Sequence, residues 1–150
     1  MEFRAGRFSA WPFRFFVPAI SLWPMDWKLE VVTVPVSDVD RAKTFYVDQA
    51  GFNADYDERP MEGIRFVQLT PPGSGCSIAI GEGLTEAPPG TAAELMLVVS
   101  DIQAAHNQLK DKGVDVSDVE IQDWGQFVYF SDPDGNKWAV QQLPPRETSS

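Results

Sequence analysis

Cysteine and histidine are almost missing from this chain, which has one of each, Cys76 and His106, in 150 residues. A single cysteine excludes an internal disulfide framework and favours a reducing compartment, so we expect a cytoplasmic protein. A single histidine, with no serine in a nucleophile-elbow motif, gives no basis for a Ser-His-Asp triad. We interpret Cys76 as a small buried hydrophobe and His106 as a surface residue of a helix.

Basic residues are also few: 12 Lys and Arg stand against 22 Asp and Glu, and the formal net charge is −10. Binding to a phosphate backbone needs the opposite sign, so the sequence predicts no nucleic-acid partner. Long hydrophobic runs are absent, since the longest uncharged apolar stretch, residues 15–25, is about half as long as a membrane-spanning helix. We therefore predict no membrane partner. The glycine-rich segment 71–75 lacks the lysine of a phosphate-binding loop.

Residues 1–24 differ in composition from the rest of the chain. They are aromatic and basic, are interrupted by Pro12 and Pro18, and show no period of 2 or 3.6 residues. No small-x-small cleavage site follows them, which disfavours a secretory signal. We interpret residues 1–24 as an N-terminal extension outside the domain, translated upstream of a natural start at Met25. The alternative is a short segment that docks on the domain or on a partner subunit.

What the chain does contain is an internal repeat. Residues 29–42 (LEVVTVPVSDVDRA) match residues 94–105 (ELMLVVSDIQAA), with Asp38 and Asp101 placed 63 positions apart. Each copy has an alternating apolar strand, a Ser-Asp step that caps a helix, and an amphipathic helix that ends at Gly51 or Gly113. Two similar half-domains pack together, and the seam between them is a place for a ligand.

The repeat predicts the order β-α-β-β-β twice within one domain, residues 25–145, followed by a tail at 146–150. The first module covers about 27–81, with strands at 29–36, 52–56, 64–70 and 77–81 and a helix at 38–50. After a linker at 82–91, the second module covers about 92–143. It has a helix from Asp101 to Gly113, one strand within 114–121, one within 126–130 and a last strand at 137–143. Residues 132–136 form a turn, to which we assign Asp132 and Asp134.

These residues resemble the vicinal oxygen chelate superfamily, which includes glyoxalase I, bleomycin-resistance proteins and extradiol dioxygenases. The matching motifs are residues 36–38 ahead of Gly51, residues 99–101 ahead of Gly113, and the sequence FSDPDGN at 130–136. The resemblance covers about residues 27–143. It implies an α+β fold of paired βαβββ modules that form a bowl-shaped mixed sheet around a ligand or metal. It also implies a homodimer.

The resemblance further implies a divalent metal held by one side chain from the first strand and one from the last strand of each half. Carried over to this chain, those positions are Val31, Ala79 (or Ser77, if the register differs by two), Glu94 and Ala139. Only Glu94 has a lone pair to offer, and one carboxylate is too little for a specific divalent site. We therefore expect that the metal site is lost, with no metal and no cofactor.

Strand alternation predicts which residues line the bowl. Side chains that point away from the helices are mainly small and apolar, which suits an organic ligand better than an ion. Trp124 and Tyr129 either stack on a flat ligand at the rim or pack in the core. Glu94 is either a general base in a partly apolar bowl or a solvated carboxylate at the start of a strand. The predicted lining is Val31, Thr33, Ser77, Ala79, Glu94, Met96, Ala139 and Gln141.

We expect a protein that binds a small organic molecule in the bowl without a metal, as sequestering members of the superfamily do. One alternative is a lyase or isomerase that uses Glu94 as general base, or a metal-dependent enzyme similar to glyoxalase or a dioxygenase. Another is an interaction module whose bowl is filled by its own side chains.

Overall fold

The computed structural model describes residues 25–146, which form two units of the same build. The first has β1 (Val31–Thr33), α2 (Val39–Thr44), the π-helix η1 (Phe45–Gln49), β2 (Asn53–Met61), β3 (Ile64–Thr70) and β4 (Ser77–Glu82). The second has β5 (Leu95–Val98), α3 (Ile102–Asp111), β6 (Glu120–Gln122), β7 (Gly125–Ser131) and β8 (Lys137–Gln142). The interpretation of residues 1–24 as an extension concerns residues outside the described ones and stays a prediction.

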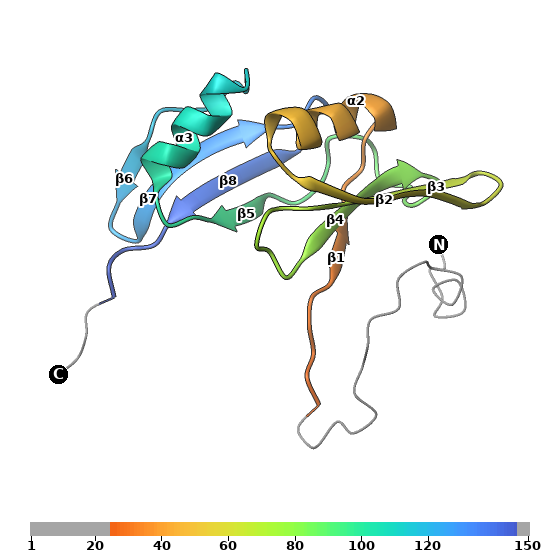
Figure 1. The fold of residues 1–150 in the computed structure, drawn as a ribbon, viewed down its shortest axis with the longest axis horizontal. Helices are drawn as coiled ribbons and strands as arrows, with labels where there is room; N and C mark the ends of the chain where they lie inside the picture. The colour runs from red at the N-terminus through yellow and green to blue at the C-terminus, as the bar shows by residue number, and fades with distance from the viewer. Residues whose placement is uncertain (1–24, 147–150) are drawn as a thin grey trace.

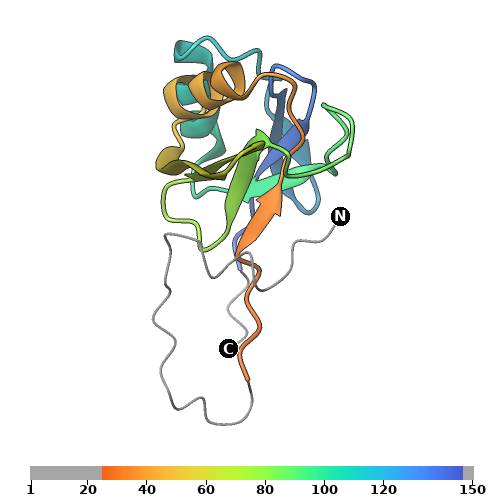
Figure 2. The same cartoon turned by 90° about the vertical axis from the view of Figure 1, so that its right-hand side faces the viewer.

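Each unit forms a four-stranded mixed sheet, in the orders β1-β4-β3-β2 and β5-β8-β7-β6. The pairs β1–β4 and β5–β8 are parallel, and the other pairs are antiparallel. Helices α2 and α3 lie on the same side of the two sheets (Figures 1 and 2). The predicted α+β fold of paired βαβββ modules is thus confirmed, and each sheet has a helix-covered face and a face turned away from the helices.

One hydrophobic core joins the two units under the helices. The apolar faces of the two predicted amphipathic helices pack in it, with Tyr46 fully buried and Leu109 8% exposed. Alternate strand residues such as Val34, Val67 and Val140 meet these helices, as the period of two requires. The shared core means that neither unit buries its helix alone.

The predicted helix ends are confirmed. The Asp38 carboxylate accepts from the Arg41 N–H at 3.1 Å, and the Asp101 carboxylate accepts from the Ala104 N–H at 3.0 Å. Gly51 follows the first helix with a φ of 82°, a conformation that L side chains disfavour. No helix among residues 25–146 is both long enough and apolar enough to cross a membrane.

The last turn of the first helix is wider than the regular helix that the sequence predicts. The Ala50 N–H donates to the Phe45 carbonyl at 2.9 Å, which is the i to i+5 spacing of a π-helix. Phe45 and Tyr46 are adjacent in the chain, yet both are buried. The wider turn brings both rings toward the core.

The strand predicted within residues 114–121 lies at the end of that range, as β6 (Glu120–Gln122). Val114 enters the core instead, and the side chain of Ser117 accepts from the Tyr129 N–H at 2.8 Å. The Tyr129 N–H of β7 thus bonds to a side chain instead of a backbone carbonyl, which interrupts regular strand pairing at this point. β1 is also shorter than the predicted 29–36, since its pairing with β4 covers only Val31 to Thr33. β2 is longer than the predicted 52–56.

Candidate functional site

The strand register places the predicted lining on the faces turned away from the helices. In the first sheet Val31 pairs with Ser77 and Thr33 pairs with Ala79; in the second, Met96 pairs with Ala139 and Val98 pairs with Gln141. Their chain neighbours Ile78, Ile80, Trp138 and Val140 belong to the core under the helices. We call these two surfaces the helix-remote faces, marked by Thr33 and Ala79 in the first sheet and by Met96 and Ala139 in the second.

The helix-remote face of the first sheet is closed by its own side chains. Phe66, Ala79 and Leu84 form a separate buried cluster on this face, and Val31 and Ile64 pack against it. Leu84 comes from the segment after β4 and is 3% exposed. A hydrophobic floor is therefore in place on this side before any ligand binds.

A chain of hydrogen bonds runs across the same face. The Gln68 side-chain amide donates to Ser77 Oγ at 3.1 Å, and Ser77 Oγ lies 2.6 Å from Thr70 Oγ1. Thr70 in turn donates to the Asp55 carboxylate. Sequence reasoning found Ser77 but missed the other three. Gln68 could have been predicted, because it is a polar residue within the apolar strand 64–70. Asp55 could not, because a register shift in β2 brings it to Thr70.

The helix-remote face of the second sheet is open and apolar. Met96, Val98 and Trp124 are 56%, 59% and 62% exposed. Phe127 stacks on Tyr129 with ring centroids 6.1 Å apart and planes at 6°. Trp124, in the turn between β6 and β7, is exposed rather than packed in the core, and Tyr129 is half-buried.

Glu94 precedes β5 and is exposed, so it lies at the end of the second sheet rather than inside it. It lines a groove of about 700 Å³ together with Tyr129, Ser131 and Lys137. The register that pairs Leu95 with Trp138 puts Glu94 next to Lys137 on the helix-remote face. This exposure matches the alternative of a solvated carboxylate at the start of a strand.

The positions that correspond to the superfamily's metal ligands do not suit a divalent ion. Ala79 and Ala139 occupy equivalent places, opposite Thr33 and Met96. Alanine and valine carry no donor atom, so Glu94 alone offers oxygen ligands. Within residues 25–146, no three His, Cys, Asp or Glu side chains are grouped so that they could hold a metal ion.

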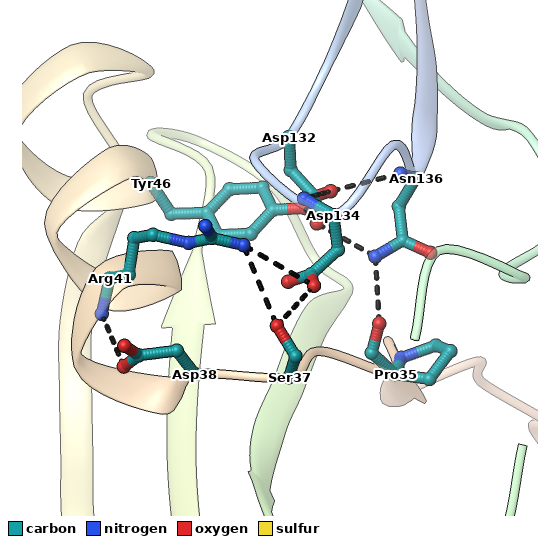
Figure 3. A network of polar contacts seen from close by, with 8 residues as sticks. All are labelled: Pro35, Ser37, Asp38, Arg41, Tyr46, Asp132, Asp134 and Asn136. Carbon is teal, nitrogen blue, oxygen red and sulfur yellow. Dashed lines mark hydrogen bonds and ion pairs between the residues drawn. The ribbon is translucent and has the colours of Figure 1, made fainter. Parts of the chain in front are cut away.

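The turn at residues 132–136 joins the two units through a buried polar network (Figure 3). Asp132 Oδ2 accepts from Tyr46 Oη at 2.7 Å and from Asn136 Nδ2 at 2.8 Å. Tyr46 Oη also accepts from Trp138 Nε1 at 3.0 Å, and Asn136 Nδ2 donates to the Pro35 carbonyl at 2.8 Å. Burial and the charge of Asp132 raise the pKa of Tyr46 above its ordinary value, so the phenol stays a donor.

A charged contact continues this seam at the surface. Asp134 accepts from Ser37 Oγ at 2.5 Å, and Arg41 Nη2 lies 3.4 Å from the same carboxylate oxygen (Figure 3). The assignment of Asp132 to turn chemistry is supported by its bonds to the N–H groups of Asp134 and Asn136. The network is a structural connection between the two units.

The single cysteine and the single histidine add no reactive pair. Cys76 is half-buried, and desolvation together with the charge of Glu30 raises the pKa of its thiol. A protonated thiol is a poor nucleophile. A ring nitrogen of His106, on α3, lies 3.1 Å from the side-chain oxygen of the adjacent Asn107.

Comparisons with known proteins agree with this architecture. The model of the Glyoxalase/Bleomycin resistance protein/Dioxygenase superfamily matches residues 28–140. The structure of TnmS3, an antibiotic binding protein from Streptomyces sp. CB03234, has a TM-score of 0.72 and 33% identity, and the match covers 84% of this chain and 98% of TnmS3. A member of the superfamily from Sphaerobacter thermophilus DSM 20745 has a TM-score of 0.69 and 31% identity, over 78% of this chain and 98% of that one. YetH of Bacillus subtilis (strain 168) is 24% identical over 117 residues, which are 77% of this chain and 98% of YetH. The chain therefore belongs to the glyoxalase/bleomycin resistance protein/dioxygenase superfamily.

Proposed function

We propose that the protein binds a small organic molecule in the bowl between its two helix-remote faces, without a divalent metal. The observation that carries this proposal is the chemistry of the four ligand positions, where Val31, Ala79 and Ala139 present hydrocarbon and only Glu94 presents oxygen. A bowl lined in this way recognises its ligand through shape and desolvation.

The open face of the second sheet supports an organic ligand. Met96 and Val98 leave apolar side chains exposed on the face that carries the stacked rings of Phe127 and Tyr129, and Trp124 is exposed in the turn before β7. Exposed apolar patches of this kind mark binding surfaces, and aromatic rings bind flat molecules by stacking. The similarity to TnmS3, described as an antibiotic binding protein, points to the same class of ligand.

We also propose a homodimer, because a second copy would cover part of this apolar surface and the edge strands. The half-buried Cys76, as the single cysteine of the chain, supports a cytoplasmic location. Analytical ultracentrifugation tests the dimer: a monomer at micromolar concentration would contradict it.

Elemental analysis tests the metal-independent part of the proposal. Purified protein is incubated with Zn²⁺, Ni²⁺, Mn²⁺ and Fe²⁺, desalted and measured for metal per chain. We expect far less than one ion per chain, and the same result for Glu94→Gln. One divalent ion bound per chain in the unaltered protein would contradict the proposal.

A thermal-shift screen with flat natural products tests the ligand part. Binding to the folded state raises Tm by mass action, so we expect stabilising compounds to appear in the screen. If none stabilises the protein, an interaction module is the better interpretation.

An enzyme is a second candidate, favoured by the place of Glu94 beside Lys137 in the groove of about 700 Å³. In this alternative Glu94 acts as the general base of a lyase or isomerase. Turnover of glutathione hemithioacetals or of ligands from the screen decides between the two. The Glu94→Gln variant loses turnover if Glu94 is the base, and changes only the affinity if the protein is a binder.

A further inference from the structure

We infer that Gln68 determines ligand specificity in the proposed bowl, and that its side-chain carbonyl oxygen selects ligands that carry a hydroxyl or N–H donor. The inference rests on the proposed function, since it concerns a ligand at the same site. The inference derives from the direction of the hydrogen-bond chain on the first sheet.

Gln68 is a buried amide with apolar neighbours on one side and the hydroxyls of Ser77 and Thr70 on the other. It is 4% exposed and pairs across the strands with Ala79, and its neighbour on the same face of β3 is Phe66. Ser77, one residue pair further along, is 6% exposed. Polar groups in such surroundings are held by specific partners, because an unpaired buried group is costly.

The chain has a fixed starting point at Asp55. The register of β2 on β3 shifts between Ala54 and Tyr56, and this irregularity brings the Asp55 carboxylate to the Thr70 hydroxyl. A carboxylate only accepts hydrogen bonds. The single proton of the Thr70 hydroxyl therefore points to Asp55.

The directions of the remaining bonds follow from this starting point. Because the proton of Thr70 is used, Ser77 donates to Thr70 across their 2.6 Å contact. Ser77 Oγ then accepts from Gln68, which must turn its NH₂ group toward Ser77 at 3.1 Å. An amide has one carbonyl and one NH₂ group, and the hydrogen-bond network decides which of them points where. The group of Gln68 that the chain does not use is its carbonyl oxygen, an acceptor.

This arrangement makes the Gln68 carbonyl a preorganised acceptor for the ligand. A ligand with a neutral hydroxyl or N–H pairs with it, whereas a ligand with an ether oxygen at the same place leaves the carbonyl unpaired. The carboxylate of Asp55 at the far end of the chain further disfavours an anionic ligand group. The expected ligand is thus a mostly apolar, flat molecule with a hydrogen-bond donor at one edge.

The test compares 7-hydroxyflavone with 7-methoxyflavone, which share one flat ring system and differ in whether one oxygen carries a proton. Isothermal titration calorimetry gives Kd for both compounds. We expect the unaltered protein to prefer 7-hydroxyflavone by about tenfold, the effect of one hydrogen bond in a buried site. Equal affinity for the two compounds would overturn the inference and leave the proposed function intact. Binding of neither compound would count against the proposed function itself.

Three variants assign the preference to Gln68. Gln68→Leu removes the carbonyl and should reduce the preference to about one. Ser77→Ala keeps Gln68 but removes the acceptor that orients its amide, so it should reduce the preference in part while both compounds still bind. Gln126→Leu alters a glutamine on the helix-covered face of β7 and should leave the preference unchanged. A tenfold preference retained in Gln68→Leu would overturn the inference. If Gln68→Leu does not fold, the result for Ser77→Ala decides.

Discussion

The two helix-remote faces are built on the same strand pattern and yet differ in chemistry. Phe66 and Gln68 stand on the first face where Phe127 and Tyr129 stand on the second, and Ala79 corresponds to Ala139. Phe66 and Phe127 are both buried, but the first face carries a hydrogen-bond chain beside its ring. The second face instead leaves Met96 and Val98 exposed. The repeat thus forms two similar helix-remote faces. The first carries hydrogen-bonding groups, and the second exposes apolar side chains.

The two seams between the units differ in a similar way. Residues Tyr46 and Leu109 are 63 positions apart and occupy equivalent places in the repeat. Tyr46 enters the buried network around Asp132. Leu109 instead lines an apolar groove of about 270 Å³ with Pro71, Pro72 and other residues of both units. One contact region between the units is thus closed by hydrogen bonds, and the other contains an apolar groove.

The largest expected difference concerns the floor of the first face. Phe66→Ala removes a ring that is 8% exposed and should lower the free energy of unfolding by about 3 kcal/mol. Met96→Ala on the second face should lower it by less than about 1 kcal/mol, since the side chain is largely exposed. Urea unfolding measures both. Equal losses would show that the second face is as well packed as the first.

A smaller difference is expected between two tyrosine hydroxyls. Tyr46→Phe removes the group that bridges Asp132 and Trp138 and should lower the free energy of unfolding by about 1–2 kcal/mol. Tyr129→Phe, on the half-buried ring of the second face, is the matched control and should change it by less than about 0.5 kcal/mol. Chemical denaturation of the two variants tests this. A larger loss of unfolding free energy in Tyr129→Phe than in Tyr46→Phe would contradict this expectation.

The second face should matter for binding rather than for stability. Trp124→Ala removes an aromatic ring that is 62% exposed, so we expect Tm to stay within about 2 °C of the unaltered value. Affinity for 7-hydroxyflavone should fall about tenfold, because a stacking surface is lost. Calorimetry and a thermal melt on the same sample separate the two effects. An unchanged Kd would show that Trp124 does not contact the ligand.

The smallest expected change in stability comes from removing an ion pair on the helix-covered side of the first unit. The Arg65 guanidinium bonds to Asp57 at 2.8 Å and 3.0 Å, and with Lys43 it holds the pKa of Asp57 well below its usual range. Because the folded-state pKa is lowered, the stabilisation is present above the ordinary value and is lost as the pH falls below it toward the folded-state value.

The variant Asp57→Asn checks this pH dependence. It should lower Tm slightly at pH 7, since partly exposed ion pairs contribute little, and the difference from the unaltered protein should shrink as the sample is acidified below the ordinary pKa of a carboxyl. A difference in Tm that grows on acidification would contradict the assignment.

Much of the fold could be predicted from the sequence, because the alternation of strands and the capping of helices are local properties. Asp38 and Asp101 cap their helices as expected, and the predicted lining falls on the helix-remote faces. Two details differ from the regular pattern. The side chain of Ser117 replaces a ladder carbonyl, and the first helix ends in a π-helical turn, in which Phe45 and Tyr46 are both buried.

Residue types and a period of two are enough to predict the repeat, the strand faces and the hydrocarbon at the metal-ligand positions. Three features appear only in the folded chain: Asp55 meets Thr70, Tyr46 reaches Asp132 across 86 positions of the chain, and Glu94 is exposed at a sheet end. Those features arise from a strand irregularity and from contacts between distant segments. Their energies depend on burial and on partner atoms that no local pattern specifies.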